Sequence, residues 1–143
     1  MIYLQSFFTK PKGQLVYSVA RWQPNGFSYK TLKVLVPYRK DGSAIKDLLP
    51  DEYLVEYLKA LKHRYKEVKK LFKLMGNEVD YTLCCWCNPK RQKGYEKLFC
   101  HTIIIGYLAE HEFNMDVKYL DGRDKPVWDK KQFLRVFNEI FER

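Results

Sequence analysis

Apolar residues follow two different periods along this chain, and the change of period separates predicted strands from predicted helices. Short β-prone apolar runs predict strands, at 2–8, 14–20, 79–87 and 115–120. Longer segments with apolar residues three and four positions apart predict amphipathic helices, at 50–75, 98–112 and 129–141. The apolar run at 32–37 lies between turn residues, so it predicts either a short strand or a packed loop.

The segment 50–75 has the clearest helix signals. Pro50 suits the first helical position, and Gly76 suits the C-terminal cap. A break near His63 and Arg64 would divide the segment into two helices. The last helix opens on a capping-box pattern, Asp129 to Gln132, and its apolar face is wide enough to require packing on the core.

Strands that alternate with helices predict an α/β fold with a mainly parallel sheet. We expect one three-layer domain over 1–143, with a four- to five-stranded sheet flanked by helices. Ligands of open parallel sheets bind beyond the carboxyl ends of the strands. The predicted strand ends carry the residues best suited to chemistry, at Ser6-Phe7, Arg21-Trp22, Cys85–Cys87 and Asp121.

The charge is uneven along the chain. The formal net charge is +9, and the first 46 residues hold eight Lys and Arg against one acidic residue, Asp41. This asymmetry favours nucleic acid or another phosphate-bearing partner; a solvated lysine-rich surface is the alternative. No stretch approaches the roughly 20 apolar residues of a membrane span, and Met1–Leu4 lack the basic segment of a secretory signal. We therefore expect a cytoplasmic protein without a membrane partner.

All four cysteines lie in the segment 79–101, together with His101. Such clustering favours a metal or catalytic site over a disulfide framework, which would spread the cysteines along the chain. Alternation along a strand places Cys85 and Cys87 on one face and Cys84 on the other. Cys84 follows Leu83 in an apolar strand, so we expect it to be a core residue.

Three interpretations of the cysteine segment stay open. Cys85, Cys87, Cys100 and His101 form a candidate metal-binding set, with zinc as the candidate ion. In the second interpretation Cys100, near a helix N-terminus, is a catalytic thiolate and His101 its acid–base partner. In the third the cysteines are buried and serve packing alone.

Candidate phosphate- or nucleic-acid-binding residues lie at two places. Arg21 and Trp22 follow a strand, where they suit a phosphate and a stacked base; a salt-bridged arginine beside a core tryptophan is the alternative. Lys90 and Arg91 belong to a basic loop that suits phosphate or is merely solvated. The chain lacks the P-loop, dinucleotide, zinc-protease and nucleophile-elbow motifs, which argues against those common classes.

The order of these features resembles the domain-of-unknown-function 488 family of small α/β proteins. The strand ending at Cys84–Cys87, the following Pro89 and the pair Cys100-His101 are similar to the family's late signature, and Val19–Pro24 to an early one. The resemblance covers about 1–113, so the strand and helix within 115–143 would pack on a family-like region. Thr102 stands where the family has Arg. The resemblance implies the fold and the place of the site, and no particular reaction.

We therefore expect a protein that binds, or binds and processes, a nucleotide or nucleic acid at a strand-end site. Cys87, Cys100, His101 and Arg21 would form that site, and a neighbouring tryptophan would stack on a base. One alternative is a metal-stabilised interaction module without catalysis. The other is a thiol-dependent enzyme that acts on a small molecule.

Overall fold

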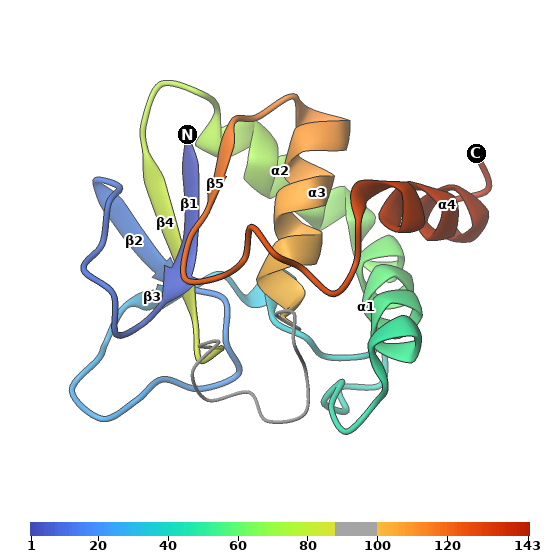
Figure 1. Ribbon diagram of the computed structural model, residues 1–143, viewed down its shortest axis with the longest axis horizontal. Helices are drawn as coiled ribbons and strands as arrows, with labels where there is room; N and C mark the ends of the chain where they lie inside the picture. Colours follow the sequence, from blue (N-terminus) through green and yellow to red (C-terminus); the bar gives the residue numbers. More distant parts are fainter. Residues whose placement is uncertain (88–99) are drawn as a thin grey trace.

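The computed structural model describes residues 1–87 and 100–143, which form a five-stranded sheet and four α-helices (Figure 1). The elements in chain order are β1 (Ile2–Ser6), β2 (Leu15–Ser18), β3 (Lys30–Thr31), the short 3₁₀ helix η1 (Lys33–Leu35), α1 (Pro50–His63), α2 (Tyr65–Met75), β4 (Tyr81–Cys85), α3 (His101–Phe113), β5 (Val117–Tyr119) and α4 (Lys130–Ile140).

The sheet has the order β3-β2-β4-β1-β5, and all its strand pairs are parallel. β1 lies between β4 and β5, with Leu4 opposite both Leu83 and Tyr119. The predicted α/β class and parallel sheet are confirmed. Because every strand points the same way, the carboxyl ends of β1, β2 and β4 meet at one edge, which is called the carboxyl edge below.

The helices cover one face of the sheet. The crossover from β3 to β4 through α1 and α2 advances across the sheet in the same direction as the crossover from β4 to β5 through α3. Right-handed crossovers then place these helices on the same face, and Figure 1 shows all four α-helices on one side of the strands. α4 packs against α1 and α3.

Loops and aromatic side chains form the layer on the other face. The connections from β1 to β2 and from β2 to β3 run in the opposite direction across the sheet, so they pass over this second face. Phe7, Ala20 and Cys84 form a small buried cluster there, against which Phe27 and Trp86 pack. No helix of the described chain covers this face (Figure 1).

The apolar run at 32–37 is a packed loop that includes η1, so the strand alternative is wrong. The amide of Leu35 donates to the carbonyl of Leu32 at 3.0 Å, which closes the 3₁₀ turn. The guanidinium of Arg64 donates to the carbonyls of Val34 and Val36. These carbonyls accept from Arg64 and, at Val36, also from the amide of Tyr38, instead of from a neighbouring strand.

Most of the predicted helix boundaries are confirmed. Pro50 begins α1, the predicted break falls at Arg64, and Gly76 follows α2 with a φ of 59°. α3 begins at His101; the earlier start predicted at Leu98 lies outside the described residues. Every described helix is too short or too polar to cross a membrane.

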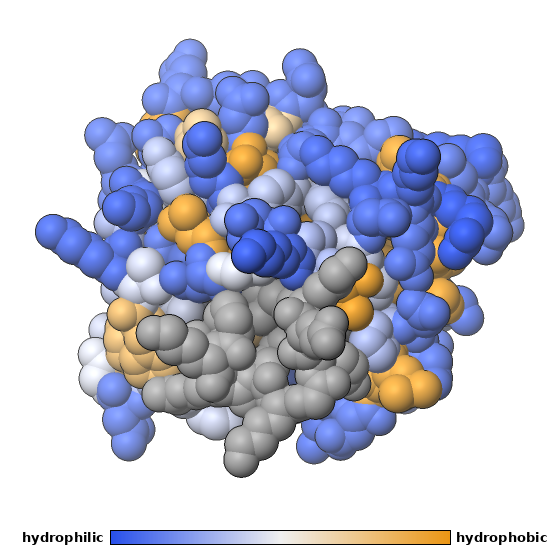
Figure 2. Space-filling view, in the orientation of Figure 1, coloured by the Kyte–Doolittle hydropathy of each residue, from blue (hydrophilic) through white to orange (hydrophobic). Residues whose placement is uncertain are grey.

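The surface agrees with the lysine-rich composition. The face shown in Figure 2 is largely hydrophilic, and its hydrophobic areas are small and separate. The lysines of α1 and α2 are exposed, at positions 59, 62, 66, 69, 70 and 73. By contrast, most of α3 is buried. Its Gly106 lies so close to the side chains of Leu4 and Tyr119 that a larger residue there would require them to shift.

Candidate functional site

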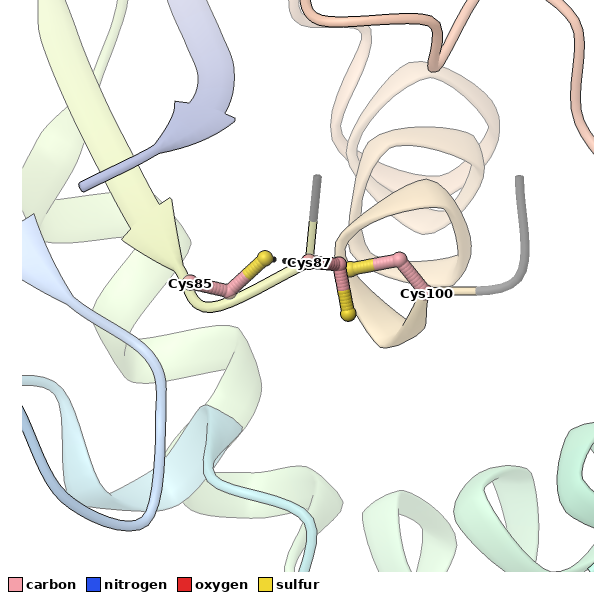
Figure 3. Close-up of side chains that lie close together, drawn as sticks. All are labelled: Cys85, Cys87 and Cys100. Carbon is pink, nitrogen blue, oxygen red and sulfur yellow. Dashed lines mark hydrogen bonds between the residues drawn. The ribbon is translucent and has the colours of Figure 1, made fainter. Parts of the chain in front are cut away.

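Three cysteine side chains meet where β4 ends and α3 begins. The sulfur atoms of Cys85, Cys87 and Cys100 all lie within 4.8 Å of one another, and the Sγ atoms of Cys85 and Cys100 are 3.1 Å apart. Figure 3 shows the three side chains converging between the strand and the helix. All four cysteines of the chain are free thiols. These three residues are called the cysteine cluster below.

Strand alternation decides which cysteines take part. Cys85 ends β4 on the face that is covered by helices, and Cys87 is on the same side two residues later. Cys84 points to the opposite face and packs with Phe7 and Ala20. The predicted alternation and the predicted core position of Cys84 are confirmed.

Arg123 packs against the cysteine cluster, and no motif in the sequence indicates it. Its side chain is 0% exposed. One terminal nitrogen lies 2.7 Å from Cys85 Sγ, 3.0 Å from the carbonyl of Cys87 and 3.8 Å from Cys100 Sγ. Its Nε donates to Thr102 Oγ1 at 2.8 Å. A buried guanidinium therefore holds the end of β4 and the start of α3 together.

The turn after β5 carries Arg123 to this position. Asp121 has a φ of 54° and Gly122 a φ of 83°, so the chain reverses sharply at the carboxyl edge. The carboxylate of Asp121 accepts the amide of Ser6 and the hydroxyl of Thr9, both at 2.8 Å, which ties the turn to the end of β1. An Asp-Gly pair favours a turn, but nothing in the neighbouring sequence indicates that the residue after it is a buried cation.

The cluster is electrostatically asymmetric. Burial alone would raise the pKa of Cys100, but hydrogen bonds from Cys85 and Cys87 and the charge of Arg123 lower it well below its ordinary value. The pKa of Cys85 is raised, first by burial, and that of Cys87 is raised by its hydrogen bonds with Cys100 and Cys85. These opposite shifts favour the thiolate at Cys100 over Cys85 and Cys87, and Cys100 lies beside the positive end of α3.

His101 lies next to the cluster but is engaged elsewhere. Its Nε2 is 2.8 Å from the carbonyl of Val19, and its ring meets Tyr57 edge-on. A carbonyl only accepts, so Nε2 carries the proton. Burial lowers the pKa of His101, which keeps the ring neutral. Its position anchors the start of α3 to the end of β2, and its ring nitrogens are not part of the group of three sulfurs.

A cleft of about 230 Å³ opens beside the cluster at the carboxyl edge. Arg21, Trp22 and Trp86 line it from the second face. Cys85 and Cys87 of the cluster and the neighbouring His101 line it from the other side. The remaining lining residues are Ala20, Pro37, Ile45 and Tyr53. The fold thus brings the candidate phosphate- and base-binding residues, Arg21 and Trp22, to the same opening as the cysteines and His101. Lys90 and Arg91, the other candidate phosphate ligands, lie outside the described residues.

A larger hollow of about 560 Å³ lies away from the cysteines, between α1 and the loop before it. Its lining mixes cations with carboxylates, and Arg39 is already paired with Glu56 at 3.4 Å. This hollow favours no ligand charge, so the cleft beside the cluster is the stronger candidate.

Comparison with protein-family models, with curated proteins and with solved structures found no match. The resemblance to the domain-of-unknown-function 488 family therefore stays a prediction.

Proposed function

We propose that the protein binds a nucleotide or a single-stranded nucleic acid in the cleft at the carboxyl edge. Arg21 would contact a phosphate, and Trp22 and Trp86 would stack on a base. The observation that carries the proposal is the meeting of an exposed arginine and two tryptophans in one cleft, beside the cysteine cluster.

The tryptophan pair supports the stacking part of the proposal. Trp22 is 62% exposed although it is a large apolar residue, and its ring centroid is 4.6 Å from that of Trp86. The indole nitrogen of Trp86 donates to the backbone carbonyl of Trp22 at 2.6 Å, which fixes the two rings relative to each other. A rigid exposed aromatic surface is the usual platform for an unpaired base.

The charge distribution supports the phosphate part. Arg21 is exposed, and within the described residues no carboxylate lies at ion-pairing distance from it. No ion pair with a described residue neutralises its positive charge, which favours a phosphate contact. Arg21, Pro37 and Ile45 of the cleft all belong to the strongly basic first 46 residues, and exposed Lys46 follows Ile45 directly.

The phosphate contact is tested by the salt dependence of binding. We expect the full chain to bind a fluorescent single-stranded oligonucleotide in an anisotropy titration, with affinity that falls as salt rises. Arg21→Gln should weaken binding and reduce the slope of log K against log salt by about 0.7, the value for one phosphate contact on a single strand. Lys73→Gln removes the same charge from α2, at the opposite edge of the sheet, and should leave the slope unchanged.

The stacking contact is tested in the same titration with two variants at one position. Trp22→Leu should weaken binding by about 1–3 kcal/mol, roughly 5- to 150-fold in Kd. Trp22→Phe retains a ring and should lose less. Equal losses in both variants, or equal effects of Arg21→Gln and Lys73→Gln, would contradict the proposal. Titration with mononucleotides in parallel distinguishes a nucleotide site from an oligonucleotide site.

A further inference from the structure

We propose that Cys85, Cys87 and Cys100 bind a thiophilic divalent metal ion, with zinc the best fit, and that Arg123 positions the three sulfurs for it. The proposal is independent of the ligand that occupies the cleft. It rests on the convergence of the three sulfurs and on the burial of Arg123 against them.

The distances suit a tetrahedral thiolate site. Zinc binds cysteine sulfur at about 2.3 Å, so two sulfurs on one tetrahedral ion lie about 3.8 Å apart. The sulfurs of Cys85 and Cys100 are 3.1 Å apart and all three lie within 4.8 Å of one another, close enough to share one such ion. Two ligands come from the end of β4 and one from the cap of α3, so small side-chain movements complete the site.

Charge balance gives Arg123 its role. A fully buried cation needs a compensating anion. Among the described residues Asp121 carries the one carboxylate at ion-pairing distance, 3.9 Å from the guanidinium, and it already accepts from Ser6 and Thr9. The sulfurs are the closer partners. Three thiolates, one divalent ion and one guanidinium sum to zero, so the loaded cluster is neutral inside the protein. The thiol protons leave to solvent when the metal binds.

The hydrogen bonds of Arg123 resemble those of residues that do not bind a metal themselves but orient the side chains that do. It donates to Cys85 Sγ and to the carbonyl of Cys87, and it also donates to the hydroxyl of Thr102, which in turn lies 3.0 Å from Cys100 Sγ. Arg123 thus touches the surroundings of all three ligands. Loss of such outer contacts commonly lowers metal affinity 10- to 100-fold.

Three sulfurs leave one tetrahedral position open. Neither ring nitrogen of His101 belongs to the group formed by the three sulfurs, so the proposed set does not include His101. Cys85 and Cys87 both line the cleft. The fourth position is therefore assigned to water or to a ligand that enters from the cleft, as in zinc sites that keep an exchangeable position.

Metal content and cobalt spectroscopy test the proposal directly. The full chain, purified under reducing conditions, should contain close to one zinc per chain by elemental analysis. After chelation, titration with cobalt should produce the sulfur-to-cobalt charge-transfer band, because thiolates are the ligands. Cys87→Ser and Cys100→Ser should each weaken that band and lower the affinity. Cys84→Ala is the matched control: it removes the neighbouring thiol on the other face and should leave the spectrum unchanged.

The role of Arg123 is tested with Arg123→Gln, whose fold is checked by circular dichroism. We expect metal affinity to fall 10- to 100-fold while the charge-transfer band at saturation keeps its intensity, because the three ligands stay. An affinity equal to that of the unchanged protein would overturn the role of Arg123. Absence of the charge-transfer band in the unchanged protein, or its equal loss in Cys84→Ala, would overturn the metal site itself. Neither result depends on nucleic-acid binding, so failure here is distinct from failure of the proposed function.

Discussion

Arg64 lies between α1 and α2, and its guanidinium is the donor for three backbone carbonyls. Nε donates to Val34 at 2.7 Å, and the two terminal nitrogens donate to Val36 at 2.6 Å and Tyr38 at 2.7 Å. The loop that these carbonyls belong to carries Pro37, which lines the cleft. One side chain thus connects a break between two helices to the shape of the candidate site.

We expect Arg64→Ala to lower the free energy of unfolding by about 2–4 kcal/mol, because three carbonyls lose a charged donor at once. Urea denaturation followed by circular dichroism measures the change. Arg64→Lys keeps the charge but not the planar donor geometry, so it should recover only part of the loss. A loss in Arg64→Ala below about 0.5 kcal/mol, the range of ordinary surface substitutions, would show that water replaces the guanidinium without cost.

At the scale of the element, α4 shows how a local signal and a tertiary contact combine. The side chain of Asp129 accepts the amide of Gln132 at 2.7 Å, which confirms the predicted N-terminal cap. The side chain of Gln132 does not complete a capping box. It donates to Asp51 of α1 at 2.7 Å and so joins the two helices.

Asp129→Ala should therefore destabilise the protein by about 1 kcal/mol, the usual cost of losing a cap. Asp129→Asn retains a side-chain oxygen and should differ from the unchanged protein by only a few tenths of a kcal/mol. Thermal or urea unfolding of the two variants separates the capping oxygen from the charge. A loss in Asp129→Asn as large as in Asp129→Ala would assign the effect to the charge.

At the scale of the whole molecule, the parallel sheet joins two features that the sequence keeps far apart. Arg21 and Trp22 follow β2, whereas the cysteine cluster belongs to β4 and α3, and Arg123 follows β5. All three places lie at the carboxyl edge because the strands are parallel. A ligand bound in the cleft should therefore change the access of solvent and reagents to the cluster.

We expect bound oligonucleotide to protect Cys87 from alkylation in chelator-treated protein, because Cys87 is half-buried and lines the cleft. At a ligand concentration ten times Kd, mass action predicts a rate roughly tenfold lower. Mass spectrometry of the labelled peptides measures the rate at each cysteine. Cys84 is buried and does not line the cleft, so its slow labelling should not change with the ligand, which makes it the internal control. An unchanged rate at Cys87 in saturated protein would place the ligand elsewhere.

The sequence was sufficient for the features that depend on neighbours in the chain. The periods of apolar residues predicted the α/β class, and Pro50, Gly76 and Asp129 marked helix ends correctly because caps are local. Alternation along β4 separated Cys84 from Cys85, since successive side chains of a strand point to opposite faces. The apolar run at 32–37 is compatible with a strand or a packed loop. Its contacts with the distant Arg64 belong to the packed loop.

The tertiary structure alone decided which residues surround the cysteines. Arg123 lies 23 residues from Cys100 and 38 from Cys85, and its neighbours along the chain, Gly122 and Asp124, are those of an ordinary exposed turn. Its burial follows from where β5 ends beside β1, one strand away from β4, which is a property of the assembled sheet. By itself the sequence determined that the cysteines and His101 share one segment of the chain. The packed sheet decided that three sulfurs face a guanidinium, while His101 turns to the carbonyl of Val19.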